Sequence, residues 1–180
     1  SEGELLQAEK ARKLNITEEI DFNIIRCKTA SLISSACAAG AYSSSQNNKL
    51  TSIMQQFGEK VGIAYQIKDD LFDYGDAKIG KPTGNDIKEK KMTLPLIFTL
   101  NHCNRTTKNK IIHIFKNAEK NKHAVRYVID EVKKHGGMAY AEEKMNMYKQ
   151  EAIDLLQIFP ESETKKHMID LVHYITNRTS

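Results

Sequence analysis

The chain has 180 residues, of which 40% are hydrophobic and 28% are charged, and its formal net charge is +4. This composition is typical of one globular domain with enough apolar material for a core, and it argues against intrinsic disorder. The sequence contains no apolar run of 18 residues, so we expect no helix that crosses a membrane. The basic residues are spread along the chain rather than clustered, which argues against a nucleic-acid-binding face.

Apolar residues recur at helical spacing along almost the whole chain, and proline is scarce, with three residues. Both features predict an all-α fold. We expect residues 1–14 to be the end of a helix, and Thr17 to cap a second helix that runs to about residue 42. Positions 24–41 of that helix are almost all Ile, Leu, Ala, Cys, Ser or Thr, which predicts a central place in the bundle.

Lys28 interrupts this apolar stretch, and two interpretations are open. The stem of the side chain can lie on apolar surface while the ammonium group reaches water, or the ammonium group can point into a polar cavity and meet an anion. The residue by itself does not decide between them.

Cysteine and histidine usage gives no indication of a transition-metal site. Cys27, Cys37 and Cys103 form no C-x-x-C pair, and the six histidines show neither H-x-x-x-H nor E-x-x-H spacing. We therefore expect reduced thiols in a cytoplasmic protein.

A third helix is predicted over residues 49–74, and its last turns carry an acidic face. Gln66, Asp69, Asp70 and Asp73 stand at i, i+3, i+4 and i+7, so they share one side of the helix. Another side is apolar and consists of Ile63, Ile67, Leu71 and Tyr74. Like charges this close repel one another by about 0.2–0.5 kcal/mol per pair even when exposed, so a bound cation would stabilise the cluster.

The ligands on this face favour magnesium as the cation. Carboxylate oxygens without Cys or His at ligand spacing select Mg²⁺, Ca²⁺ or Mn²⁺ over Zn²⁺. Mg²⁺ is usually held by one or two protein carboxylates while substrate phosphates supply further oxygens, whereas an EF-hand would spread its calcium ligands along a loop. The D-D-x-x-D spacing alone is also typical of a solvated acidic face, and that alternative stays open at this point.

Residues 75–86 are predicted to form a basic loop beside the acidic face, with Lys78, Lys81 and Gly84 among them. A basic loop next to carboxylates is a suitable place for a phosphate. The rest of the chain is predicted to be helical scaffold. Its helices are expected over residues 92–104, 109–116, 123–134, 138–158 and 161–177, with a break at Gly136 and Gly137.

Three motifs follow one another in this region without interruption. Q-x-x-D-D-x-x-D is followed by G-K-P-x-G-N-D and then by E-K-K-x-T-L-P-L-I. In this order they resemble the second aspartate-rich region of the trans-isoprenyl diphosphate synthases, the polyprenyl synthetase family. The K-T dipeptide at Lys28 and Thr29 and the L-x-x-F-P-x-S turn before the closing helix extend the resemblance over nearly the whole chain. The fold that it implies is a helical bundle of the isoprenoid synthase type.

The resemblance implies a Mg²⁺-dependent condensation of an allylic diphosphate with isopentenyl diphosphate, in which the diphosphate of the allylic substrate leaves. Asp69, Asp70 and Asp73 match the second metal-binding motif of the family. Carboxylates that bridge metal ions to departing phosphates stabilise charge as it develops, which is usually the largest contribution to such catalysis.

The resemblance also assigns roles to cationic and neutral polar residues. Lys28, Lys81 and Lys91 match positions that contact the allylic diphosphate. Thr29 and Gln66 match residues that face the developing allylic cation, where their oxygen dipoles would stabilise positive charge. This interpretation places Lys28 in a polar cavity.

One departure from the family pattern is large. The chain has a single D-D-x-x-D motif and lacks the basic G-K-x-x-R element that binds isopentenyl diphosphate. The remaining aspartates stand alone in the sequence and form no second motif; they are Asp21, Asp76, Asp86, Asp130, Asp154 and Asp170. The start, SEGELLQAEK, has neither an initiating Met nor an apolar stretch, so we expect neither a signal peptide nor a natural beginning.

We therefore expect residues 1–180 to be the C-terminal part of a longer homodimeric synthase, with an incomplete helical barrel that is inactive alone and self-associates. The alternative is a noncatalytic helical partner or regulatory subunit that binds prenyl diphosphate. A terpene cyclase would also bind diphosphate with Mg²⁺, but the G-K-P-x-G-N-D segment argues against it. Product length cannot be read from this sequence.

Overall fold

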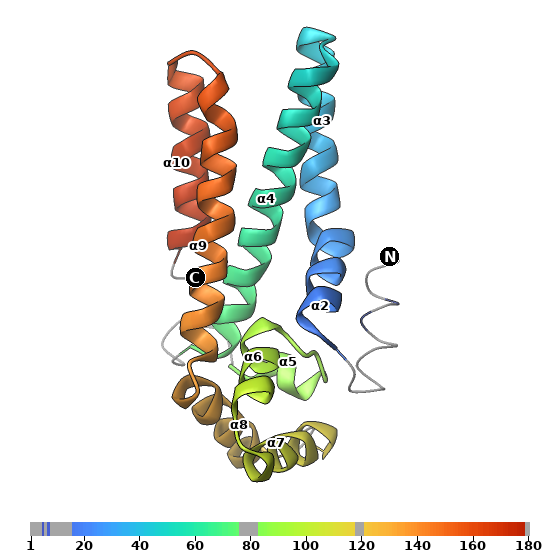
Figure 1. The fold of residues 1–180 in the computed structure, drawn as a ribbon, viewed down its shortest axis with the longest axis vertical. Helices are drawn as coiled ribbons and strands as arrows, with labels where there is room; N and C mark the ends of the chain where they lie inside the picture. The colour runs from blue at the N-terminus through green and yellow to red at the C-terminus, as the bar shows by residue number, and fades with distance from the viewer. Residues whose placement is uncertain (1–4, 6, 8–15, 76–82, 118–120, 179–180) are drawn as a thin grey trace.

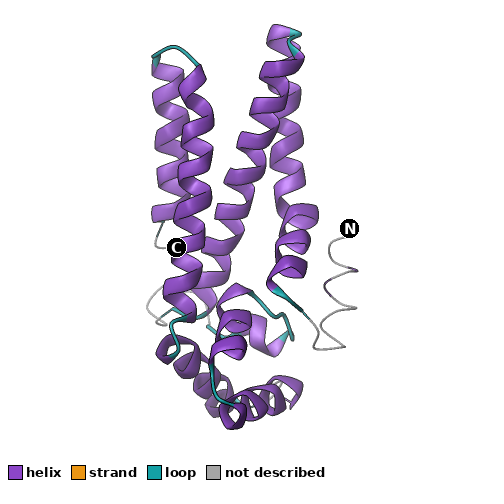
Figure 2. Cartoon of the chain, viewed as in Figure 1, coloured by secondary structure: helices purple, strands orange, loops and turns teal. Residues whose placement is uncertain are grey.

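A computed structural model of the chain describes residues 5, 7, 16–75, 83–117 and 121–178. All regular structure in these ranges is helical, as predicted (Figure 2). Two long helix pairs run side by side along the long axis, and shorter helices close one end (Figure 1). The helix expected over residues 1–14 lies almost entirely outside the described residues.

The first described helix begins where the sequence predicts, since the Thr17 hydroxyl accepts a hydrogen bond of 3.3 Å from the backbone N–H of Ile20. Helix α2, Glu18–Ile25, continues without a break through a π-helical turn, Arg26–Ala30, into α3, Ser31–Ser45. The turn contains Lys28 and Thr29, and such turns within α-helices are frequent at functional sites.

Helix α4, Asn48–Asp73, is the central element of the described fold. Asn47 caps its start, because the side-chain oxygen of Asn47 accepts hydrogen bonds from the backbone N–H groups of Lys49 and Leu50. It packs against α3 on one side and α9 on the other (Figure 1). Its predicted apolar face is confirmed, because Ile63, Ile67 and Tyr74 are fully buried.

Residues 24–41, which we expect to be central only in a complete bundle, are largely uncovered in the described part of the chain. Ile24 and Ile25 at the start are buried, but Ser34 is the only buried residue of α3, and Leu32 is 75% exposed. The physical reason is that α3 packs mainly against one neighbour, α4, so most of its circumference meets no other described helix.

Two glycines let the backbones of these helices approach closely. A Cβ atom on Gly58 would lie 2.7 Å from the carbonyl oxygen of Ile33, and one on Gly62 would lie 2.6 Å from the Cα of Ala30. Neither distance is compatible with a side chain. The close approach places the π-helical turn directly against α4.

The remaining helices follow the predicted order. They are α5, Asn85–Lys88; α6, Leu94–His102; α7, Arg105–Asn117; α8, Lys122–Lys134; α9, Gly137–Leu155, extended by a 3₁₀ turn, Leu156–Ile158; and α10, Glu163–Asn177. The short α5 was not predicted. The break before α9 is confirmed, because Gly136 adopts a φ of +79° that favours glycine.

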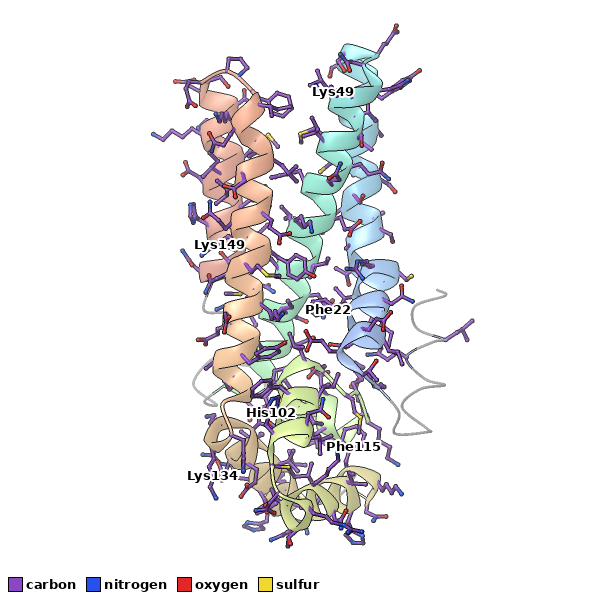
Figure 3. All side chains as sticks on the ribbon, in the orientation of Figure 1. Phe22, Lys49, His102, Phe115, Lys134 and Lys149 are labelled. Atoms are coloured by element: carbon purple, nitrogen blue, oxygen red, sulfur yellow. The ribbon has the colours of Figure 1, made fainter. Side chains whose placement is uncertain are left out.

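Side chains occupy the space between the helices (Figure 3). The buried apolar residues of the described ranges form three clusters. Phe22 of α2 packs against Tyr148 of α9 with ring centroids 5.5 Å apart, and Phe115 of α7 is fully buried in the cluster at the closed end. The three cysteines are free. No helix in the described ranges is both long and apolar enough to span a bilayer.

Candidate active site

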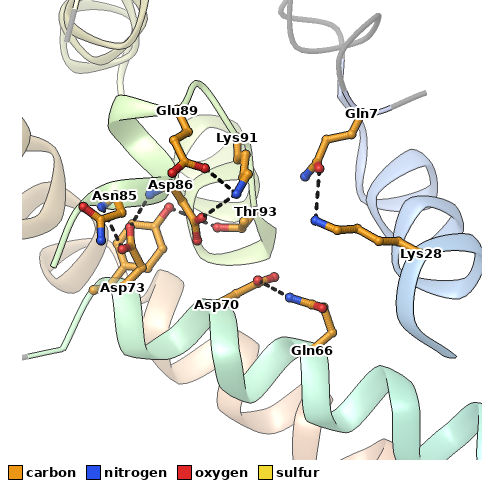
Figure 4. Close-up of polar contacts among 11 residues, drawn as sticks. Gln7, Lys28, Gln66, Asp70, Asp73, Asn85, Asp86, Glu89, Lys91 and Thr93 are labelled. Carbon is orange, nitrogen blue, oxygen red and sulfur yellow. Dashed lines mark hydrogen bonds and ion pairs between the residues drawn. The ribbon is translucent and has the colours of Figure 1, made fainter. Parts of the chain in front are cut away.

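A polar cavity of about 240 Å³ lies where α2, the π-helical turn, the end of α4 and the segment before α6 meet (Figure 4). Lys28, Gln66, Asp69, Asp70 and Lys91, all predicted from the sequence, line it. Lys28 therefore lines a polar cavity, which is the second of its two interpretations. A second hollow next to it is lined by Asp69, Asp73, Asp86 and Lys91 among others.

A short chain of hydrogen bonds joins three of the predicted residues across this cavity. The Thr29 hydroxyl donates to Oε1 of Gln66 at 2.7 Å, and Nε2 of Gln66 donates to Oδ1 of Asp70 at 2.9 Å. Asp70 is 6% exposed, and burial raises the pKa of its carboxyl well above the usual value. The neighbouring Asp21 raises that pKa further, while the bond from Gln66 opposes the shift.

Asp73 is engaged by the backbone that follows it. Its Oδ1 accepts from the N–H of Asn85 at 2.8 Å and its Oδ2 from the N–H of Asp86 at 3.0 Å (Figure 4). Burial raises the pKa of Asp73, and these two backbone bonds oppose the rise. The carboxylate therefore fixes the start of α5 against the end of α4, in addition to any role toward a metal.

The predicted lysines come from different walls of the cavity. Lys28 Nζ donates to Oε1 of Gln7 at 3.5 Å, and Lys91 Nζ forms ion pairs with Glu89 and, at 3.6 Å, with Asp86. Burial alone would lower the pKa of Lys91, but its carboxylate partners raise it overall. Lys81 lies outside the described residues.

Two aspartates that stand alone in the sequence, outside any D-D-x-x-D motif, belong to this site. Asp21 and Asp86 line the same cavity as Asp69 and Asp70. The signal for Asp21 was its spacing, because it stands seven residues before Lys28 and so on the same helix face. The signal for Asp86 was its place at the end of G-K-P-x-G-N-D.

Their environment is strongly acidic. Asp21 is 2% exposed, and its Oδ2 has no hydrogen-bond partner among the described residues. Burial, followed by the charges of Glu18 and Asp86, raises the pKa of Asp21 to about 8. Burial and the neighbouring Asp73 raise the pKa of Asp86 to about 6, while Lys91 opposes that rise. A bound cation would relieve this repulsion between carboxylates.

The donor set fits a hard divalent cation that takes part of its coordination from a ligand. The side chains that could hold it are carboxylates, and an unpartnered buried Asp21 oxygen lies among them. No group of three or more His, Cys, Asp or Glu in the described ranges is arranged to hold a metal ion alone. A divalent cation held by one or two protein carboxylates takes its remaining oxygens from phosphate and water.

A residue that sequence reasoning missed lies at the end of the described chain. Arg178 Nη2 lies 3.5 Å from Oδ1 of Asp69, and its guanidinium group lies over the rings of Tyr65 and Phe72. No motif pointed to it, because the two members of the ion pair are separated by 109 positions in the sequence.

The chain is similar in sequence to known prenyl diphosphate synthases. The family described as polyprenyl synthetase matches residues 1–132. The chain is 31% identical over 156 residues to heptaprenyl diphosphate synthase component 2 of Bacillus subtilis, covering 86% of this chain and 44% of that protein. It is 32% identical over 158 residues to geranylgeranyl diphosphate synthase of Sulfolobus acidocaldarius, covering 87% of this chain and 48% of that protein.

Solved structures resemble it over nearly its whole length. A geranylgeranyl pyrophosphate synthase from Bacteroides thetaiotaomicron is 36% identical with a TM-score of 0.91, covering 98% of this chain and 59% of that one. A polyprenyl synthase from Caulobacter crescentus, solved with calcium and isoprenyl diphosphate, is 26% identical with a TM-score of 0.92, covering 99% and 55%. The chain thus spans about half the length of the proteins that it matches.

Proposed function

This chain belongs to the polyprenyl synthetase family, and we propose that it is the C-terminal part of a prenyltransferase that joins an allylic diphosphate to isopentenyl diphosphate and releases diphosphate. The observation that carries the proposal is the convergence of carboxylates and lysines in one cavity. Asp69 and Asp70 on α4 share it with Lys28 from the π-helical turn and Lys91 from the segment before α6. Diphosphate with divalent metal is a ligand that needs both kinds of group.

Asp69 and Asp70 are the residues that would hold Mg²⁺ here, and the metal would neutralise the departing diphosphate. The chain's own groups prepare the site for that ligand. Gln66 holds the buried Asp70 carboxylate in place, and Asp73 fixes the backbone of Asn85 and Asp86 beside it. The carboxylates are thereby positioned before any ligand arrives.

Lys28 and Lys91 would bind oxygens of the allylic diphosphate, together with Lys81. Lys91 forms ion pairs with Glu89 and Asp86 in the structure. Its ammonium N–H donors would therefore be divided between these carboxylates and a phosphate. Glu89 is mostly exposed, with a side chain 58% accessible, so releasing it into water costs little.

Thr29 and Gln66 would stabilise the allylic cation as the diphosphate leaves. Because the Thr29 hydroxyl proton is donated to Gln66, the lone pairs of Thr29 Oγ1 remain available to face positive charge. The same bond orients the Gln66 carbonyl toward the π-helical turn. Fixed oxygen dipoles of this kind stabilise charge without having to reorganise during the reaction.

Labelled isopentenyl diphosphate provides the test of the proposal. The full-length protein that contains this chain is expected to incorporate the label only with an allylic diphosphate and Mg²⁺, whereas residues 1–180 alone are expected to give no turnover. Asp69→Ala is expected to lower turnover by at least about a hundredfold, as when one preorganised electrostatic contact is lost. Asp170→Ala, an exposed site on α10, is the control.

A noncatalytic subunit is the second candidate, because one similar protein is named as a component of a heptaprenyl diphosphate synthase. It predicts a full-length protein without turnover that binds a prenyl diphosphate or a catalytic partner. Absence of incorporation by the full-length protein, with retained binding of an allylic diphosphate, would favour this alternative over the enzyme.

A further inference from the structure

Arg178 reaches the candidate active site from the C-terminal end of α10. Its Nη2 lies 3.5 Å from Oδ1 of Asp69, the first carboxylate of the D-D-x-x-D motif. The Arg178 side chain is 17% exposed, whereas that of Asp69 is 42% exposed. The cation is thus the more buried member of the pair.

Two aromatic rings hold the guanidinium group in place. Its central carbon lies 4.4 Å from the ring centroid of Tyr65 and 5.1 Å from that of Phe72. Tyr65, Asp69 and Phe72 stand at i, i+4 and i+7 on α4, so they form one stripe on the helix. A guanidinium group is attracted to the faces of such rings, so the location of Arg178 does not depend on Asp69 alone.

The packing of α10 fixes where Arg178 lies. Val172 and Thr176 are buried, and the backbone N–H of Arg178 donates to the carbonyl of Tyr174 at 3.0 Å. At the other end of the helix, the ammonium group of the buried Lys165 donates to Glu161 at 2.6 Å and to the carbonyl of Phe159 at 3.1 Å. The packing of α10 therefore holds Arg178, the residue that follows its last turn, in a fixed position against α4.

Arg178 also has hydrogen-bonding capacity beside Asp69. Nε and Nη2 lie on the same edge of a guanidinium group, and a carboxylate commonly accepts from both. Nη2 contacts Asp69, while the buried Nε has no hydrogen-bond partner among the described residues. The guanidinium group therefore has two donors on one edge to offer a carboxylate, which is the arrangement that fixes a carboxylate's orientation.

We propose that Arg178 is a positioning residue that orients the Asp69 carboxylate and so sets how tightly the site takes a divalent metal. The inference rests on the proposed function, because it takes Asp69 as a metal ligand. A residue that hydrogen-bonds a ligating carboxylate fixes its orientation, and loss of such a partner typically costs about 10- to 100-fold in metal affinity or activity.

The test compares metal dependence in the full-length protein. Arg178→Ala is expected to raise the Mg²⁺ concentration for half-maximal rate about tenfold, and to weaken binding of Mn²⁺, measured by electron paramagnetic resonance, by a similar factor. Arg178→Lys keeps the charge but loses the planar guanidinium group, so its Mg²⁺ requirement is expected to lie between those of the wild type and Arg178→Ala. Arg126→Ala is the matched control, because Arg126 pairs with Asp130 at 3.1 Å on the surface of α8.

Combining variants separates positioning from a structural role. In an Asp69→Asn background, Arg178→Ala is expected to change the metal requirement by less than about twofold, since neighbouring residues of one network are not additive. Full multiplication of the two effects, or an unchanged Mg²⁺ and Mn²⁺ dependence in folded Arg178→Ala, would overturn the inference. If Asp69→Asn itself leaves the metal requirement unchanged, the proposed function fails instead.

Discussion

The hydroxyl of Thr29 donates a hydrogen bond of 2.7 Å to the side-chain oxygen of Gln66, which joins the π-helical turn to the acidic face of α4. Gln66 donates in turn to Asp70. A change at Thr29 therefore reaches a predicted metal ligand through one intermediate residue. The turn that presents Thr29 is held against α4 by the close approach of Ala30 to Gly62.

Thr29→Val removes this hydroxyl while keeping the shape of the side chain. It is expected to lower kcat of the full-length enzyme about 10- to 100-fold, a loss at or below that usually found when one oriented dipole is removed. The KM for isopentenyl diphosphate is expected to change little. Steady-state kinetics with an allylic diphosphate provide the measurement. Thr106→Val on the exposed surface of α7 is the control, and an equal loss in that variant would contradict a role specific to Thr29.

Gly84 connects the acidic helix to α5, and its replacement is expected to disturb both. Its φ of +78° disfavours side chains, and an added Cβ atom would overlap Val125. Gly84→Ala is expected to lower the free energy of unfolding by about 1–3 kcal/mol. Denaturant unfolding of the full-length protein measures this loss.

Gly40→Ala supplies the matched control for that substitution. Gly40 lies within α3, and an added Cβ atom there would meet nothing within 4 Å. Because alanine is the better helix former, this variant is expected to be neutral or to gain up to about 1 kcal/mol. Equal losses in both variants would show that the backbone at Gly84 has no special requirement.

Local sequence signals predicted the helices well, because the start, the end and the buried face of a helix depend on residues that are close together in the sequence. Thr17 caps the start of α2, and the apolar residues at helical spacing give α4 its buried face. Gly136, with its positive φ, forms the break before α9. The grouping of Gln66, Asp69 and Asp70 followed from the helical period alone. These features do not depend on which helices become neighbours.

The parts that the sequence did not reveal depend on tertiary packing. Asp21 reaches the cavity because α2 crosses the end of α4, and Arg178 reaches Asp69 because α10 packs back on α4. How much of residues 24–41 is covered also depends on packing, since composition does not say how many neighbours a helix has. Leu32 is 75% exposed despite its apolar surroundings in sequence.

Asp21 predicts a dependence of stability on pH. Burial raises its pKa from 3.8 to about 8, so the folded protein binds this proton more tightly than the unfolded chain. The resulting stabilisation is fully present below the unfolded value and is lost as the pH rises through about 8. In metal-free buffer, Asp21→Asn is therefore expected to match the wild type near pH 4 and to exceed it above pH 8.

Thermal unfolding of the full-length protein across this range is the measurement. At the alkaline end the variant is expected to unfold at a higher temperature; about 1 kcal/mol shifts a domain of 150–250 residues by about 2–4 °C and a longer chain by less. Asp170→Asn on the surface of α10 is the control and should show no such trend. A difference between Asp21→Asn and wild type that stays constant with pH would contradict the assigned shift.

The exposed face of α3 predicts that residues 1–180 self-associate when produced alone. Leu32 is 75% exposed and Tyr42 is 53% exposed, and both lie on this helix. Each large apolar side chain left in water forgoes about 1.5–3 kcal/mol of burial free energy, so a second copy that covers the face would be favoured. Sedimentation equilibrium at micromolar concentration is expected to show an oligomer whose population rises with concentration.

Leu32→Glu is the variant that tests this surface, because Ile25 is 3% exposed and a charge there would damage the core instead. A carboxylate at position 32 would have to be desolvated in the oligomer, so the variant is expected to shift the equilibrium to monomer while circular dichroism stays helical. Leu171→Glu is the matched control, since Leu171 is 55% exposed but lies on α10. A wild-type chain that is monomeric at every concentration would show that α3 needs no cover, and dissociation by Leu171→Glu alone would place the contact on the opposite pair of helices.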